Sequence, residues 1–252
     1  MDYSEEELDL TNAHLPTLDN VPLSTGLTSL DLTANSLREL EPRLLALTGL
    51  RKLSLRQNVL TSAEPLSRCA FAPVLQELIL QDNHISQVPE MSAMTSLTRL
   101  ELSYNQIKSL SPLSSCRALG MQELYISNNK LSTLEGCSHL AGLTLLELGA
   151  NRLTHVSGIE SHPHLKELWL GSNRIAQTQS LSCLTKLERL SIQSNRLTSM
   201  AGLCLPATLR ELYLSHNYIE TIQGLECLHQ LRVLDLANNA LGKLSGVDDF
   251  PG

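Results

Sequence analysis

Six acidic or aromatic side chains recur at almost constant intervals along the second half of this sequence. They are Glu101, Tyr125, Glu147, Trp169, Tyr213 and Asp235, and Ser191 divides the one long interval. Aromatic side chains are frequent anchors of protein interfaces, and interleaved carboxylates complement a basic surface. The pattern therefore predicts noncovalent recognition of a folded protein that presents a basic or polar patch. The alternative interpretation is structural, because strands favour aromatic residues in any case.

Catalytic motifs are missing from the sequence. It holds no Gly-x-Ser-x-Gly, no phosphate-binding glycine-rich loop after a strand and no His-Glu-x-x-His. Glu101 and Glu147 would lie two strands apart, roughly 10 Å at the usual strand spacing, which is too far to share a proton. We therefore expect no enzyme activity and no cofactor.

Histidine and cysteine residues give only weak metal signals. His162 and His164 flank Pro163 without a recognisable set of further ligands, so a zinc site is not expected. The six cysteines form no Cys-x-x-Cys pair, which indicates reduced thiols rather than a disulfide framework. Five cysteines are interpreted as small buried apolar side chains on the outer segments. These are Cys116, Cys137, Cys183, Cys204 and Cys227.

The elements that must position the acidic and aromatic set are copies of one short unit. Residues 165–175 read Leu-x-x-Leu-x-Leu-x-x-Asn-x-Ile, and this frame recurs at a constant interval around six asparagines. These frame asparagines are Asn129, Asn151, Asn173, Asn195, Asn217 and Asn239. A fixed period of this length with this pattern is the signature of a leucine-rich repeat. We predict an α/β leucine-rich-repeat solenoid (horseshoe), with a parallel β-sheet on the concave face and short 3₁₀ or loop segments on the convex face.

The chemistry of one unit predicts where its side chains point. Alternation with period two turns the leucines into the stack and the residue at the fifth position, counted from the first leucine, onto the concave face. The frame asparagine is expected to turn inward and to bond backbone groups of adjacent turns. A column of glycines predicts tight turns with positive φ before short 3₁₀ segments. It comprises Gly136, Gly158, Gly202, Gly224 and Gly246.

The domain organisation follows from the same frame. Residues 1–26 are predicted to be an N-terminal capping segment, in which Ala13 replaces the frame asparagine. Residues 27–252 are predicted to form a solenoid of ten full repeats. Extra residues in Thr61–Val74 and Ser111–Gly120 are assigned to the outer side, where insertions are tolerated. No C-terminal cap is recognisable, so the last repeat is expected to be open or covered by a partner, unless the chain is a fragment.

Charge and composition limit which classes of partner and which cellular locations are expected for this protein. A formal net charge of −7 argues against nucleic acid, because phosphate neutralisation needs clustered Lys and Arg. The acidic start of the chain has no signal peptide, and no apolar run reaches the roughly 18 residues of a membrane span. We expect a cytoplasmic or nuclear protein, with the ciliary axoneme as a further location, that binds neither nucleic acid nor membrane.

The residues of several repeats resemble one family. Residues 146–153, 190–197 and 209–217 are similar to successive repeats of the leucine-rich-repeat regulatory subunit of protein phosphatase-1, and the resemblance covers most of residues 50–241. It implies a regulatory subunit that docks the phosphatase catalytic subunit on its concave face. The implied contacts are Glu101, Tyr125, Glu147, Trp169, Tyr213 and Asp235, with Tyr125 and Trp169 where the family has Phe. A ternary complex with a further inhibitor protein is also implied.

Two features leave this interpretation open. The family continues with further repeats and a C-terminal cap, whereas this sequence ends at Gly252. Short repeats of this kind also occur in axonemal dynein light chains and splicing proteins, so the alternative is a structural scaffold of a ciliary axoneme or splicing complex. One more segment, Arg68–Phe71, is loosely similar to the Arg/Lys-Val-x-Phe peptide that docks on protein phosphatase-1, with Cys69 in place of Val.

Overall fold

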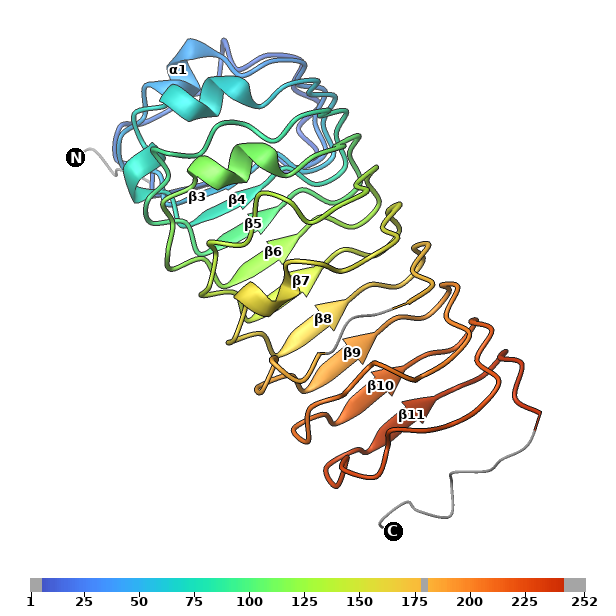
Figure 1. Cartoon of the computed structure of the whole chain (residues 1–252). Helices are drawn as coiled ribbons and strands as arrows, with labels where there is room; N and C mark the ends of the chain where they lie inside the picture. The colour runs from blue at the N-terminus through green and yellow to red at the C-terminus, as the bar shows by residue number, and fades with distance from the viewer. Residues whose placement is uncertain (1–5, 178–180, 243–252) are drawn as a thin grey trace.

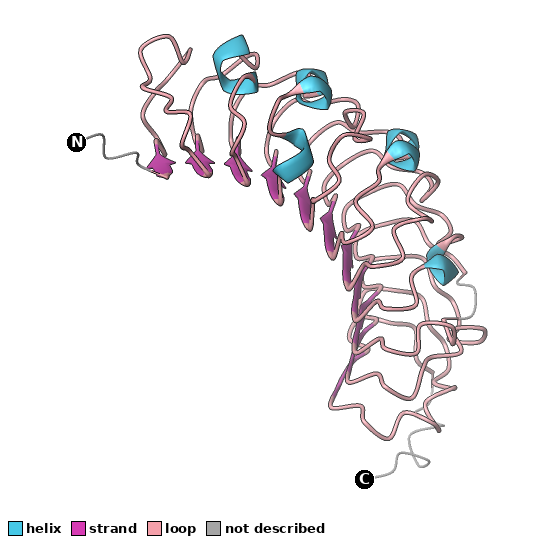
Figure 2. Ribbon diagram, turned by 90° about the vertical axis from the view of Figure 1, so that its left-hand side faces the viewer, coloured by secondary structure: helices cyan, strands magenta, loops and turns pink. Residues whose placement is uncertain are grey.

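The computed structural model describes residues 6–177 and 181–242, and these form a curved solenoid (Figures 1 and 2). A single parallel sheet of 11 strands runs along it, and the strands follow one another in sequence order. The strands are β1 (Glu7–Asp9), β2 (Ser29–Asp31), β3 (Lys52–Ser54), β4 (Glu77–Ile79), β5 (Arg99–Glu101), β6 (Glu123–Tyr125), β7 (Leu145–Glu147), β8 (Glu167–Trp169), β9 (Arg189–Ser191), β10 (Glu211–Tyr213) and β11 (Val233–Asp235). The predicted leucine-rich-repeat fold is confirmed.

Each strand is short because only its central residue points into the stack. Leu168 is fully buried at the centre of β8, and its register partners on either side are Leu146 and Leu190. This in-register pairing of identical side chains copies one aliphatic layer along the whole solenoid. The first and third residues of every strand therefore face the concave side, where two parallel rows of side chains are presented to a partner.

The convex side carries the few helical turns, as Figure 2 shows. They are α1 (Pro42–Leu45) and the 3₁₀ turns η1 (Glu64–Arg68), η2 (Ala72–Val74), η3 (Ser111–Ser115) and η4 (Ile159–Ser161). The predicted insertions are confirmed on this side, because η1 and η2 lie within residues 61–74 and η3 lies within residues 111–120.

The glycine column has the predicted backbone conformation at its four described positions. Gly158 has a φ of 91° and caps the start of η4, while Gly136 has a φ of 109° and a Cβ there would lie 2.2 Å from the Leu110 carbonyl oxygen. Gly202 and Gly224 also have positive φ, but of the four glycines only Gly158 leads directly into a described 3₁₀ turn. Gly246 lies outside the described residues.

The frame asparagines connect successive turns as predicted. The Asn173 amide donates to the carbonyl of Leu148 in the preceding repeat at 3.0 Å and to that of Leu170 in its own repeat at 3.0 Å. Its Oδ1 accepts from the backbone N–H of Leu153 at 3.0 Å. These partners are buried backbone groups that water cannot reach, so each asparagine satisfies groups that would otherwise be unpaired.

The two ends of the solenoid differ from its middle. In the segment predicted to be a cap, β1 extends the sheet by pairing with β2, and Leu18 is buried while Leu8 is only partly covered. At the other end, Leu234 and Leu236 are also only partly buried. Each end repeat has a described neighbour on one side only, which accounts for this exposure. The proposed boundary between cap and repeats stays a prediction.

The prediction that five outer cysteines are buried is wrong for three of them. Cys116 and Cys137 are buried, as is Cys69. Burial raises the pKa of the Cys137 thiol to about 11, which keeps it protonated and unreactive at neutral pH. In the later outer turns leucines take the interior positions, as Leu181 and Leu184 do on either side of Cys183, and the remaining thiols are exposed. The exposed cysteines are Cys183, Cys204 and Cys227.

The segment that resembles a phosphatase-docking peptide is not available for docking. Phe71, its aromatic residue, is fully buried under the outer turns, so its ring cannot reach a partner. The short resemblance at Arg68–Phe71 therefore describes part of the core rather than a recognition motif. Among the described residues, no helix is long and apolar enough to cross a membrane.

Candidate functional site

The acidic and aromatic set forms one row on the concave face. Each member is the last residue of its strand, and the strand register aligns Glu101 with Tyr125, Glu147 with Trp169, and Tyr213 with Asp235. Ser191 completes the row between Trp169 and Tyr213. The structure thus brings the six residues together as expected from their spacing, while their role in binding stays a prediction.

Glu101 is less accessible than its position in the row suggests. Its side chain is buried, and its Oε1 accepts the Ser103 backbone N–H at 2.8 Å. Desolvation raises the pKa of this carboxyl above its ordinary value, and the charge of Glu147 acts in the same direction. Glu101 is thus mostly buried although it stands in the row on the concave face, and its contact with a partner stays a prediction.

The three aromatic residues of the row share a local hydrogen bond that their spacing in the sequence does not reveal. Each stands at the end of a Glu-Leu-aromatic strand, and its polar hydrogen is donated to the glutamate two residues earlier. The Tyr125 hydroxyl bonds Glu123 at 3.0 Å, the Trp169 indole N–H bonds Glu167 at 3.2 Å, and the Tyr213 hydroxyl bonds Glu211 at 3.0 Å. Each ring is therefore held along the sheet with its polar group satisfied.

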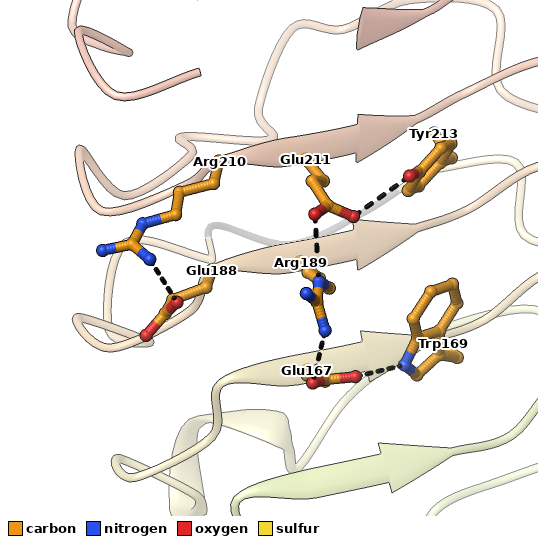
Figure 3. Close-up of polar contacts among 7 residues, drawn as sticks. All are labelled: Glu167, Trp169, Glu188, Arg189, Arg210, Glu211 and Tyr213. Atoms are coloured by element: carbon orange, nitrogen blue, oxygen red, sulfur yellow. Dashed lines mark hydrogen bonds and ion pairs between the residues drawn. The ribbon is translucent and has the colours of Figure 1, made fainter. Parts of the chain in front are cut away.

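These glutamates belong to a second row, formed by the first residues of the strands. Arg189 lies between two of them and bonds Glu167 at 2.9 Å and Glu211 at 3.1 Å (Figure 3). Further along the row, Lys52 pairs with Glu77 and Arg99 pairs with Glu123. The sequence-based interpretation missed this row. The sequence nevertheless indicates this row, because the third position of the repeats carries charges that mostly alternate in sign. These residues are Lys52, Glu77, Arg99, Glu123, Glu167, Arg189 and Glu211.

Contacts between rings and cations join the two rows into a continuous surface. The rings of Trp169 and Tyr213 stack with their centroids 6.3 Å apart and their planes at 21°. The Arg99 guanidinium lies over the Tyr125 ring, 4.8 Å from its centroid. Burial raises the pKa of Tyr125 to about 12, and its hydrogen bond to Glu123 acts in the same direction. Aromatic stacking and cation–π contacts of this kind make the surface rigid before any partner arrives.

The charge of the concave face is more balanced than the acidic row implies. The glutamates beside the rings are paired with arginines, so they offer little net charge to a partner. The Glu147 side chain makes no hydrogen bond or ion pair with any residue that the structure describes, while the Asp235 side chain only accepts the Ala237 backbone N–H at 3.0 Å. Glu147 and Asp235 are therefore the carboxylates of the row best placed to attract a cationic group.

The histidine pair does not form a metal site. His162 is fully buried, with its Nδ1 3.1 Å from the Leu140 carbonyl oxygen, whereas the Nδ1 of His164 lies 2.8 Å from Lys186 Nζ on the surface. The two imidazoles thus have separate partners. In the part of the chain that the structure describes, no three His, Cys, Asp or Glu side chains come together as a metal-binding group.

Comparison with protein families identifies the repeat type. A model described as leucine-rich repeats (2 copies) matches residues 73–115, 163–204 and 207–249, and a leucine-rich repeat model matches residues 95–153. A chain from an internalin, InlF, of Listeria monocytogenes has a TM-score of 0.67 at 22% identity, covering 95% of this chain and 83% of its own. A chain from the octameric complex of latrophilin 3, Unc5D and FLRT2 has a TM-score of 0.77 at 23% identity, covering 98% and 78%. At these identities the likeness shows the fold alone.

A curated relative shares more of the sequence over a shorter stretch. The protein phosphatase 1 regulatory inhibitor subunit PPP1R7 homolog of Arabidopsis thaliana is 46% identical over 90 residues. The match covers 35% of this chain and 27% of the Arabidopsis protein. The resemblance to phosphatase regulatory subunits, first indicated by individual repeats, is confirmed by this relative.

Proposed function

This chain belongs to the leucine-rich repeat family, and we propose that it is a non-catalytic regulatory subunit that binds the catalytic subunit of protein phosphatase-1 on its concave face. The observation that carries the proposal is the relative that is 46% identical and is named as a regulatory inhibitor subunit of this phosphatase. That relative matches a third of the chain, so partner and binding face are both part of the proposal.

The geometry of the concave face supports a protein partner. From Glu101 to Asp235 the row crosses six strand spacings, or roughly 29 Å, which is the width of an ordinary protein–protein footprint. Trp169 is the middle residue of the row and Tyr213 lies two strands further along, and both side chains are partly exposed. Rigid aromatic side chains at the centre of a footprint commonly supply most of the binding energy.

The side-chain network lowers the cost of binding. Glu167, Arg189 and Glu211 already hold the rings of Trp169 and Tyr213 in place. Because these side chains are ordered before binding, little entropy is lost when a partner binds over them. The Glu147 carboxylate lies directly before Trp169 in the row and would attract a basic side chain of the partner. We therefore propose an apolar contact over the two rings, flanked by an ionic contact at Glu147.

The proposal is tested with purified protein phosphatase-1 catalytic subunit and isothermal titration calorimetry. Trp169→Ala is expected to lose about 2 kcal/mol or more of binding free energy, or roughly 30-fold in Kd. Leu119→Ala is the control, since Leu119 is 72% exposed on the outer side and its truncation also removes apolar surface. Retention of the phosphatase by the parent and the control but not by Trp169→Ala supports the concave face.

Two results would reject the proposal. Absence of binding to the parent chain removes the phosphatase as a partner, and equal binding by Trp169→Ala and the parent removes the concave face. In the first case, co-fractionation with axonemes or with a splicing complex tests the scaffold alternative. If the phosphatase binds, adding a phosphatase inhibitor protein to the preformed complex tests the proposed ternary assembly.

A further inference from the structure

A row of basic side chains follows the frame asparagines along one edge of the solenoid. The residue directly after the asparagine is basic in four successive repeats, although the chain carries a net charge of −7. The row comprises Lys130, Arg152, Arg174 and Arg196, one from each repeat. Each member follows the last residue of a strand (β6, β7, β8 or β9) by five residues, so the row lies on the loops after the strands and is separate from the concave row of acids and rings.

The backbone of this edge is fixed at every step. The N–H of each basic residue donates to a carbonyl of the preceding repeat, as Arg152 does to Leu131 at 2.8 Å and Arg174 does to Leu153 at 2.9 Å. Arg196 repeats the contact with Ile175 at 2.9 Å. The four side chains therefore leave the solenoid from equivalent points at each strand spacing, and over three spacings of about 4.8 Å they span roughly 14 Å.

No acidic side chain that the structure describes neutralises the row, and Lys130 Nζ donates only to the neutral Gln106 Oε1 at 3.3 Å. The Arg152, Arg174 and Arg196 side chains are exposed and make no hydrogen bond or ion pair with the described residues. By contrast, Arg189 and Arg210 are paired with glutamates nearby. No Asp or Glu occurs within three residues of any member of the row, where the neighbours are mostly small and neutral. An uncompensated run of cations in an acidic protein is a local positive field.

From this arrangement we propose that the basic row, residues Lys130, Arg152, Arg174 and Arg196, binds an acidic segment of a partner protein in extended conformation. At about 3.3 Å per residue, an extended segment of four or five residues covers the roughly 14 Å of the row. Arginine side chains bond carboxylates with two parallel hydrogen bonds, which favours acidic side chains over a diffuse anion.

The surroundings of the row favour a peptide over a nucleic acid. Single-stranded nucleic acid needs aromatic side chains along the path for base stacking, as well as cations. Along this edge the sole aromatic side chain among the equivalent positions of residues 130–240 is Tyr218, which stands beyond the end of the row.

The test is fluorescence anisotropy with the full chain and a labelled octaglutamate peptide, compared with a labelled octaglutamine peptide. The triple variant Arg152→Gln, Arg174→Gln, Arg196→Gln is expected to weaken octaglutamate binding about tenfold at low salt. The three Arg→Lys substitutions, which keep the charges but lose the paired hydrogen bonds, are expected to weaken it less. The charge-matched control is Arg51→Gln, Arg68→Gln, Arg117→Gln, which removes three exposed arginines outside the row. This control is expected to change Kd less than twofold.

The outcomes separate the row from general charge effects. Saturable binding of octaglutamate, absent for octaglutamine and lost selectively in the row variant, supports the proposal. Equal weakening by the control triple assigns the binding to net charge and overturns it, as does the absence of octaglutamate binding. Tighter binding of a labelled oligouridine that depends on the same three arginines also overturns it, because the occupant is then a nucleic acid.

Discussion

Trp169 and Tyr213 stack against each other across an intervening strand, with ring centroids 6.3 Å apart and planes inclined by 21°. The strand between them contributes Ser191, which is 2% exposed beneath the rings. A larger residue at this position would fill the space through which the rings meet. Ser191 interrupts the acidic and aromatic pattern in the sequence. Because its side chain is small, the rings of Trp169 and Tyr213 can meet and form one surface.

Removing Tyr213 is expected to expose the indole of Trp169. Because Trp169 is the only tryptophan of the chain, the emission of Tyr213→Ala should shift to longer wavelength as water reaches the uncovered ring face. The control is Tyr218→Ala in the same repeat, whose ring is 61% exposed and makes no ring contact with Trp169. An identical emission maximum for Tyr213→Ala and the parent would contradict the stacking.

Arg189 is expected to hold the network beside these rings through two ion pairs. Arg189→Gln leaves Glu167 and Glu211 without their shared cation, and the loss of unfolding free energy should be small, because all three side chains are exposed to screening by solvent. Arg210→Gln, which breaks one pair with Glu188, is the control and should cost less. The comparison is made by urea unfolding at low and high salt, and a loss that is unchanged by salt would argue against an ionic contribution.

The fold was predictable because one physical pattern is repeated along the chain. Leucines at period two and an asparagine in every full repeat specify the strand, its buried face and the turn that follows, as Leu168 and Asn173 illustrate. The sheet and the row from Glu101 to Asp235 follow from stacking this unit, whereas three of the four outer 3₁₀ turns lie in the longer outer segments.

The details of the candidate site were less predictable because they depend on pairs of neighbouring repeats. Glu101 is buried by the residues around it, and Arg189 bridges a glutamate of the preceding repeat and one of the following repeat. Neither feature is visible in a single repeat. Cys183 is exposed because Leu181 and Leu184 on either side of it take the interior positions of that outer turn. The charge alternation and the basic row become visible only when equivalent positions of successive repeats are compared.

Replacing a frame asparagine in the middle of the stack should destabilise the protein strongly. Asn173→Leu leaves the buried Leu148 carbonyl and the Leu153 N–H without their side-chain partner, at an expected cost of about 1–3 kcal/mol. Asn239→Leu is the matched control, since Asn239 makes the same contacts at the last described repeat but is only partly buried. Thermal and urea unfolding measure the stability of both variants. A melting curve of Asn173→Leu identical to that of the parent would exclude the structural role of the frame asparagines.

The buried His162 should make stability depend on pH. Desolvation lowers the pKa of this imidazole in the folded protein below its ordinary value of 6.5, despite the hydrogen bond with the Leu140 carbonyl. The unfolded chain therefore takes up a proton more readily than the folded one. The stabilising contribution of neutral His162 is fully present above about pH 6.5 and is lost as the pH falls through the folded-state pKa.

Two histidine variants isolate this effect in melts recorded from pH 8 to pH 5. His162→Gln is expected to lower the Tm at pH 8, because it replaces a well-packed ring, but to reduce the fall in Tm between pH 7 and pH 5. His164→Gln is the control, because His164 is exposed two residues away and should leave the slope of the parent unchanged. Parallel pH profiles for the parent and His162→Gln would show that the imidazole is protonated equally in both states, contrary to its burial.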